Sequence, residues 1–190
     1  MFSTQGIVKP KRLEFEKKTK SDFYGKFSAG PFEQGYGVTI GNSIRRMLLS
    51  SIEGAAIVGA RFEGVYHEFS AIPGVLEDVT EIILNLKEVH LKMADEISEK
   101  RIHLKKDQAG KVYAKDIADS SQITVLNPDH HIATLDASGE LNMEMIVRKG
   151  RGYVPAENQD MEAESVQMIP IDAIFSPIEK VRYHIEHTRV

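Results

Sequence analysis

The sequence contains no cysteine and no tryptophan among its 190 residues. Without cysteine, the chain has no disulfide, no thiolate zinc ligand and no cysteine nucleophile. It also has no apolar run of about 18 residues, so no segment is predicted to cross a membrane as a helix. The N-terminus lacks the apolar core of a signal peptide. We therefore expect a cytoplasmic protein with no membrane partner.

An excess of positive charge is also missing. The 24 lysines and arginines stand against 28 aspartates and glutamates, which gives a net charge of −4. Such a chain has no overall positive field to attract nucleic acid. Its hydrophobic content of 42% and charged content of 27% are typical of a soluble globular protein. At this length the chain forms one large domain or two small ones.

Common catalytic motifs such as G-x-S-x-G and H-E-x-x-H do not occur in the sequence. The two close histidine pairs do not suit a metal, because their members point to opposite faces of a predicted strand: His130–His131 and His184–His187. The adjacent acids Glu77 and Asp78 fall on a predicted helix and face different ways. We expect no catalytic residue, no metal site and no cofactor in this chain.

One stretch, Glu33 to Ser51, organises the first part of the chain: E-Q-G-Y-G-V-T-I-G-N-S-I-R-R-M-L-L-S-S. Its apolar residues recur with the spacing i, i+4, i+7, i+8 and predict one stripe of an α-helix: Ile40, Ile44, Met47 and Leu48. Arg45 and Arg46 lie off this stripe. A helix this short gains little from propensity, so its stripe must be buried against something else.

The glycines that open this stretch, Gly35, Gly37 and Gly41, allow two interpretations. A glycine-rich loop before a helix can hold a phosphate on its backbone N–H groups, although this spacing matches neither common nucleotide-binding motif. Alternatively, the glycines permit a tight strand-to-helix turn and close packing of the helix against another backbone.

The rest of the chain predicts one more helix and many short strands. An amphipathic pattern from Val75 to Leu86 predicts a helix with acids in its early turns and Lys87 near its end, as the helix dipole favours. Strands are predicted from alternation and from β-rich composition, and turn residues separate the later ones. They cover residues 13–15, 23–32, 55–69, 89–93, 102–104, 111–115, 122–126, 131–135, 141–149 and 181–185. The last would rejoin the first sheet.

One compact segment, Lys149 to Tyr153, is basic, glycine-rich and aromatic. It suits a contact with RNA or phosphate, and it equally suits a loop that docks on a protein. The net negative charge favours the protein partner. Residues 157–165 are acidic and without pattern, which predicts a surface loop.

Five segments together resemble the N-terminal region of the alpha subunit of bacterial-type RNA polymerase, in order along nearly the whole chain. The first is the stretch from Glu33 to Ser51. The others are G-V-Y-H-E-F-S at 64–70, G-V-L-E-D-V-T-E-I-I-L-N-L-K at 74–87, V-R-K-G-R-G-Y-V-P-A at 147–156 and D-A-I-F-S-P-I-E-K-V-R-Y at 172–183.

The resemblance implies an α+β fold in two pieces. Residues 1–53 and 176–190 would form a discontinuous dimerisation subdomain, and residues 54–175 an inserted, mainly β subdomain. The dimerisation subdomain would consist of a sheet plus the helix in Glu33 to Ser51, which is the signature helix of the family. It also implies an assembly scaffold for DNA-directed RNA polymerase, which dimerises and recruits the catalytic subunits beta and beta-prime. Nucleotidyl transfer with magnesium then belongs to the large subunits, and this chain has no active site.

The resemblance also assigns contact residues. The stripe Ile40, Ile44, Met47 and Leu48 lies at the dimer interface, Arg46 contacts beta, and the beta-prime contacts are Lys87, Ile171 and Arg189. In the family another strand, a long helix, a linker and a DNA-binding domain follow the point where this chain stops, Val190. We therefore expect a fragment that dimerises through the signature helix alone and makes no direct DNA contact. The alternative hypothesis is a small nucleotide-binding or nucleic-acid-binding domain.

Overall fold

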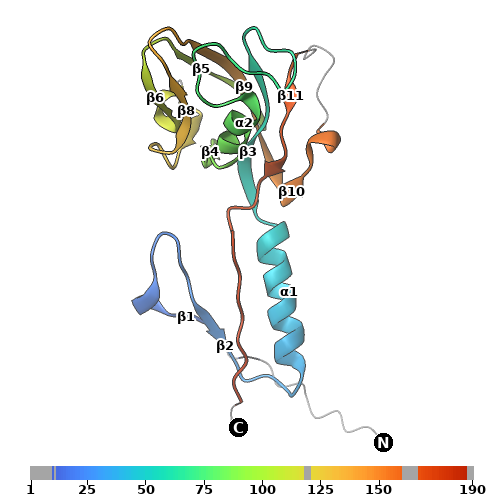
Figure 1. Cartoon of the computed structure of the whole chain (residues 1–190). Helices are drawn as coiled ribbons and strands as arrows, with labels where there is room; N and C mark the ends of the chain where they lie inside the picture. The colour runs from blue at the N-terminus through green and yellow to red at the C-terminus, as the bar shows by residue number, and fades with distance from the viewer. Residues whose placement is uncertain (1–9, 11, 118–120, 160–166, 188–190) are drawn as a thin grey trace, which may run out of the picture. The chain divides into compact units, whose positions relative to one another are not determined.

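The computed structural model describes residues 10, 12–117, 121–159 and 167–187 (Figure 1). The predicted contact residue Arg189 and most of the predicted acidic loop therefore lie outside the described residues. The chain forms two compact units, one of Met1–Leu48 with Lys180–Val190 and the other of Leu49–Glu179. Helices and antiparallel strands occur together, which confirms the α+β class.

The smaller unit holds a hairpin and most of a long helix. Strands β1 (Leu13–Phe15) and β2 (Phe27–Ala29) pair antiparallel, joined through the 3-10 turn η1 (Lys17–Thr19). Helix α1 (Tyr36–Ser50) follows and lies within the stretch Glu33 to Ser51, where the sequence predicts a helix. The predicted strand at 181–185 is wrong, because residues 181–187 have no regular secondary structure.

Instead of forming a strand, this C-terminal segment packs against the glycines of α1. Gly35 precedes the helix with a φ of 89°, which favours glycine. Gly37 and Gly41 lie inside the helix, so they do not form a phosphate-binding loop. A Cβ on Gly41 would come within 2.7 Å of the Tyr183 ring, and one on Gly37 within 3.4 Å of Ile185. The glycines thus permit close packing, but against side chains rather than against another backbone.

The larger unit is built on a 6-stranded antiparallel sheet in the order β5-β9-β3-β4-β7, with β11 also paired to β3. Its strands are β3 (Glu53–Phe62), β4 (Leu91–Met93), β5 (Glu99–Lys106), β7 (Ile123–Val125), β9 (Leu141–Arg151) and β11 (Ile169–Pro170). The long strand β9 lies between β3 and β5 and pairs with both along most of its length (Figure 1).

Two small strand pairs and a helix complete this unit. Strands β6 (Gly110–Tyr113) and β8 (His131–Leu135) form one pair, and β10 (Tyr153–Val154) and β12 (Ala173–Ile174) the other. The 3-10 turns η2 (Ala114–Asp116) and η3 (Ala156–Asn158) follow β6 and β10. Helix α2 spans Val79–Lys87 and starts four residues later than the pattern predicts. Asp78 ends the preceding loop by capping the helix, since its carboxylate accepts the N–H of Glu81 at 2.7 Å.

The core of the larger unit lies between α2 and one face of the sheet. Val79, Ile82 and Leu86 of α2 are buried there, packed with apolar residues of the strands. Burial of each such side chain stabilises the fold by about 1.5–3 kcal/mol. On the opposite face a second cluster forms from Ala56, Val58, Ile146, Ala173 and Phe175. The middle of β9 is therefore buried on both faces.

The basic segment Lys149 to Tyr153 is not the loop that its composition predicts. Its first residues end β9 and pair with β3, in the register Ala55↔Lys149 and Glu53↔Arg151. Gly150 permits this because the Phe175 ring occupies the space that a Cβ would need, 2.7 Å away. Both cations face carboxylates, Lys149 at 3.8 Å from Asp95 and Arg151 at 3.9 Å from Glu53. The segment is a strand end with its charges compensated.

Candidate functional site

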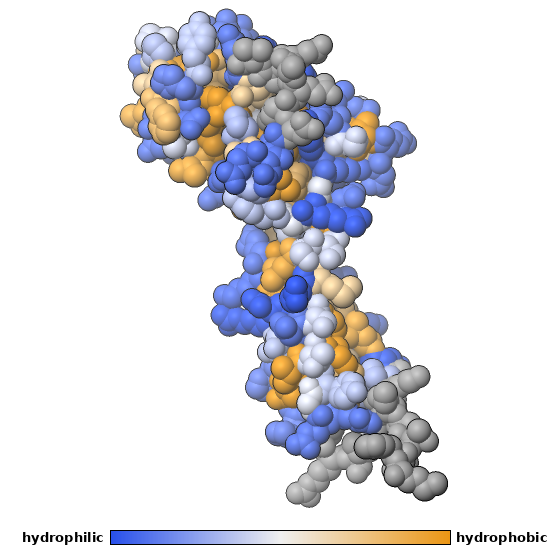
Figure 2. All heavy atoms as spheres, turned by 90° about the vertical axis from the view of Figure 1, so that its right-hand side faces the viewer, coloured by the Kyte–Doolittle hydropathy of each residue, from blue (hydrophilic) through white to orange (hydrophobic). Residues whose placement is uncertain are grey.

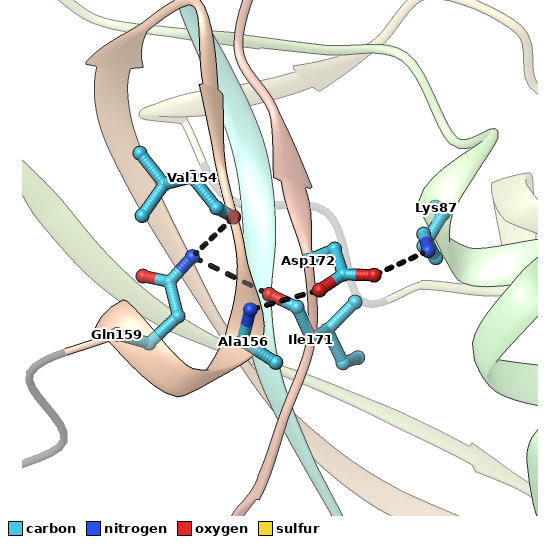
Figure 3. Close-up of polar contacts among 6 residues, drawn as sticks. All are labelled: Lys87, Val154, Ala156, Gln159, Ile171 and Asp172. Atoms are coloured by element: carbon cyan, nitrogen blue, oxygen red, sulfur yellow. Dashed lines mark hydrogen bonds and ion pairs between the residues drawn. The ribbon is translucent and has the colours of Figure 1, made fainter.

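The most connected polar cluster that includes a predicted contact residue lies at the C-terminal end of α2. There the ammonium of Lys87 is 2.9 Å from Oδ2 of Asp172, a residue 85 positions later in the chain (Figure 3). The other carboxylate oxygen, Oδ1, accepts the backbone N–H of Ala156 at 2.8 Å. One carboxylate thus joins α2, the start of η3 and the segment between β11 and β12.

Alternation along the chain directs Asp172 outward. Its neighbours Ile171 and Ala173 are buried, with 1% and 0% of their surface exposed. The N–H of Ile171 donates to the carbonyl of Val58 in β3 at 2.8 Å, which fixes the segment on the sheet. In an extended chain successive side chains point to opposite sides, so burial of both neighbours leaves Asp172 facing away from the core.

Longer contacts close the cluster on its other side. The amide nitrogen of Gln159 lies 3.4 Å from the carbonyls of Val154 and Ile171 (Figure 3). These distances are at the limit of a hydrogen bond, so each contact is weak. The two bonds of Asp172 are therefore the firmest polar links within this group.

The cluster keeps Asp172 ionised. The hydrogen bond from Lys87 holds the pKa of Asp172 below its ordinary value, and the Ala156 N–H acts in the same direction against partial burial. At neutral pH the side chain is then a pure acceptor, with both oxygens engaged. Such a carboxylate is suited to holding structure in place and is poorly suited to taking up a proton from a substrate.

Exposed apolar side chains stand beside this polar cluster. Tyr153 of β10 and Ile174 of β12 are direct partners in the strand register, and they are 60% and 56% exposed. By contrast, the side chains of Lys87 and Asp172 are only 24% and 33% exposed. Aromatic residues are enriched at protein–protein contacts, so this exposed pair is a candidate contact surface.

The predicted stripe of α1 forms a separate candidate surface in the smaller unit. Across α1, every residue of which is described, no side chain is buried. Ile44 and Met47 are 43% and 62% exposed, while Ile40 and Leu48 are half-buried. Figure 2 shows hydrophobic surface left open on this unit. Arg46 is exposed on the same helix.

Two of the predicted contact residues, Lys87 and Ile171, lie in the same cluster. They are linked because Asp172, the residue after Ile171, pairs with Lys87. Ile171 itself is buried, so any part it has in a contact is indirect. Sequence reasoning missed Asp172, Ala156 and Gln159. The one available signal for Asp172 is its place as an acid between two apolar residues, which gives no hint of Lys87 as its partner.

Another partly buried carboxylate, Glu77, serves the fold. It accepts hydrogen bonds from the N–H and hydroxyl of Thr134 at 2.6 and 3.0 Å, and it lies 2.8 Å from Nε2 of His131. Burial alone would raise the pKa of Glu77, but the bonds with His131 and Thr134 outweigh burial and lower it. Contrary to the sequence prediction, Glu77 is not on a helix but in the loop before α2, where it ties that loop to β8.

The described part of the chain holds neither a candidate cluster of metal ligands nor a candidate membrane-spanning helix. Its residues include no group of three or more histidine, cysteine or acidic side chains placed to hold a metal ion. Within residues 10, 12–117, 121–159 and 167–187, no helix combines the length and apolarity needed to cross a bilayer.

Comparison with known proteins places the larger unit in a described family. Residues 57–176 match the model of the RNA polymerase Rpb3/RpoA insert domain. This range contains α2, the whole cluster around Asp172 and the sheet without the first four residues of β3.

Curated relatives match over nearly the entire chain. The protein from Leptospira biflexa named DNA-directed RNA polymerase subunit alpha is 53% identical over 98% of this chain and 58% of its own length. Proteins of the same name from Geobacter metallireducens and Symbiobacterium thermophilum are 52% and 51% identical over 97% of this chain. These matches cover 54% and 58% of the two relatives. The chain thus spans somewhat more than half the length of the relatives it matches.

Proposed function

The chain belongs to the family of the RNA polymerase Rpb3/RpoA insert domain, and on that premise we propose that it is an assembly scaffold of DNA-directed RNA polymerase. In this role it dimerises and recruits the beta and beta-prime subunits. The observation that carries the proposal is that the chain resembles proteins named as alpha subunits over 97–98% of its residues. Exposed apolar side chains on both of its units support the same role.

The dimer contact is proposed for the apolar stripe of α1. Ile44 and Met47 remain open although they are large and apolar, and their burial against a second copy would remove this area from water. Ile40 and Leu48 flank them on the same helix and complete the stripe. We assign the dimerisation subdomain to residues 1–53 and 176–190 and the inserted subdomain to residues 54–175.

The large subunits are proposed to dock at two other places. Arg46 is off the apolar stripe of α1 and is the proposed contact with beta. The beta-prime contact is proposed around Lys87, on the surface where Tyr153 and Ile174 are exposed. Ile171 is buried and is proposed to contribute by packing beneath this surface. Arg189 is assigned to the same contact by family resemblance alone.

This chain is proposed to carry no step of the nucleotidyl transfer itself, which belongs to the large subunits. The carboxylates of Glu77 and Asp172 are engaged in hydrogen bonds within the fold. We further propose that it works in the cytoplasm and makes no direct contact with DNA.

Co-purification tests the proposal. A tagged chain should retain purified beta and beta-prime, and titration of the chain alone with nucleotides or with DNA should give no heat. Retention of neither large subunit would contradict the scaffold role. Saturable, strongly salt-dependent binding of nucleic acid would instead favour a nucleic-acid-binding domain.

A further inference from the structure

We propose that Asp172 is the positioning residue of the beta-prime docking surface, and that Lys87 acts by holding Asp172 rather than by pairing with an acid of the partner. The inference rests on the proposed function, because it concerns the same surface.

The two oxygens of Asp172 hold two different elements. Oδ2 is 2.9 Å from the ammonium of Lys87 at the end of α2, and Oδ1 is 2.8 Å from the N–H of Ala156 at the start of η3. These elements are far apart in the chain and share no strand pairing. The carboxylate therefore acts as a clamp that links α2 to η3. Loss of either oxygen would free one of these two elements.

The ammonium of Lys87 is already engaged. Only 24% of the Lys87 side chain is exposed, and its nitrogen points to Asp172 rather than outward (Figure 3). An ammonium has three N–H donors, so an acid of the partner could approach Lys87 without displacing Asp172. Loss of the pair would leave the Asp172 carboxylate, two-thirds covered, without its charge partner, which is costly. The pair within the chain is therefore retained when a partner docks.

The clamp fixes the strand pair that presents Tyr153 and Ile174. Ala156 follows β10 after a single proline, so its bond to Asp172 anchors the end of that strand. Strand β10 is also held by pairing with β12 over two residues on each strand and by the bond from the N–H of Phe175 to the carbonyl of Gly152 at 2.8 Å. The Tyr153 side chain hydrogen-bonds to Asp172, and Gln159 adds its long contacts. So short a strand pair is marginal alone. The direction of Tyr153 and Ile174 thus depends on Asp172.

A double-mutant cycle tests the inference on the intact subunit with purified beta-prime. Asp172→Asn keeps the shape of the side chain but offers one acceptor oxygen where the carboxylate offers two. Lys87→Met keeps the apolar stem and removes the charge. We expect each change to weaken beta-prime binding about tenfold, as loss of a charged hydrogen bond does. The double variant should be no weaker than either single one, because both changes remove the same clamp.

Hydrogen exchange supplies a readout without the partner. The amide of Ala156 should exchange at least tenfold faster in Asp172→Asn, since its acceptor is lost or contested. Lys105→Met is the matched control. Its ion pair with Glu140, 3.3 Å long and 64% and 54% exposed, lies in the same unit. This control should change neither beta-prime binding nor exchange at Ala156.

Three results would overturn the inference while leaving the proposed function in place. One is normal beta-prime binding by Asp172→Asn beside weakened binding by Lys87→Met, which would make Lys87 a direct contact. Another is a double variant weakened by the product of the two single effects. The third is unchanged exchange at Ala156. If the unaltered subunit does not bind beta-prime at all, the proposed function fails and this inference fails with it.

Discussion

Gly41 of α1 lies directly beneath the ring of Tyr183, so closely that a Cβ at this position would stand 2.7 Å from the ring carbon Cδ2. One turn earlier Gly37 faces Ile185 at 3.4 Å, an ordinary contact distance. The two glycines therefore form a notch on α1 that receives alternate side chains of the C-terminal segment. A methyl group would fit at Gly37 but has no room at Gly41.

This difference predicts opposite effects of the same substitution. Gly37→Ala should stabilise the chain by about 0.5–1 kcal/mol, because alanine favours the helix and its methyl group fits. Gly41→Ala should lose that gain, because the methyl group displaces Tyr183, and overpacking costs about 1–3 kcal/mol. Urea denaturation measures both effects, and the NMR signals of the Tyr183 ring report its displacement. Equal stabilisation by both variants would show that Tyr183 does not depend on the notch.

Ile44→Asp should abolish self-association. Ile44 is central in the stripe, and a carboxylate there would be buried without a partner in the dimer. Sedimentation velocity measures the effect, with Asn42→Asp as the control, because Asn42 is exposed on α1 away from the stripe. The dimer contact would have to be sought elsewhere if Ile44→Asp and the unaltered chain sediment as the same oligomer.

Arg46→Ala should weaken binding to beta and leave the fold intact. The side chain is exposed, so its truncation opens no cavity. An arginine buried at an interface costs roughly 2 kcal/mol or more when truncated, whereas an exposed ion pair contributes about 0–1 kcal/mol. Titration of beta onto immobilised chain distinguishes these cases. Arg45→Ala is the neighbouring control, and an equal loss in both variants would remove the specific role of Arg46.

Asp172 should make the free energy of unfolding depend on pH in the acidic range. Its bonds with Lys87 and Ala156 lower its pKa in the folded chain, so the unfolded chain takes up this proton first as the pH falls. The contribution is therefore fully present above the unfolded pKa, about 3.9, and is lost as the pH falls through the lower folded pKa.

The measurement is the difference in free energy of unfolding between the unaltered chain and Asp172→Asn across this range. We expect a constant difference at pH 6–7 that shrinks below about pH 4. Asp129→Asn, at an exposed ion pair with Lys115, is the control. A difference that grows as the pH falls would show that the bonds favour the protonated carboxyl group.

Local patterns were enough to predict many elements of this fold. The stripe at Ile40 and Ile44 predicts α1, and the short strand predicted at residues 131–135 is β8 at its observed bounds. The start of α2 could not be read from hydrophobic spacing, because Val75 and Leu76 fit the helical period while the Asp78 cap begins the helix later. A capping residue outweighs periodicity where the two compete.

Non-local packing explains the remaining errors. Val181, Tyr183 and Ile185 alternate as a strand would, yet the latter two pack onto the glycines of α1, a contact that alternation cannot distinguish from a sheet. Lys149 to Tyr153 has the composition of a loop, but Gly150 is needed beneath Phe175 and the segment is a strand end. The clamp at Asp172 joins residues 85 positions apart, and no local pattern carries that information.

Sedimentation velocity of the chain mixed with purified beta and beta-prime tests the central claim most directly. The account predicts a single larger complex that contains two copies of this chain with one copy of each large subunit. It also predicts that Ile44→Asp, which should not pair with a second copy, gives no such complex. If the unaltered chain sediments separately from both large subunits at every concentration, it is not an assembly scaffold for them.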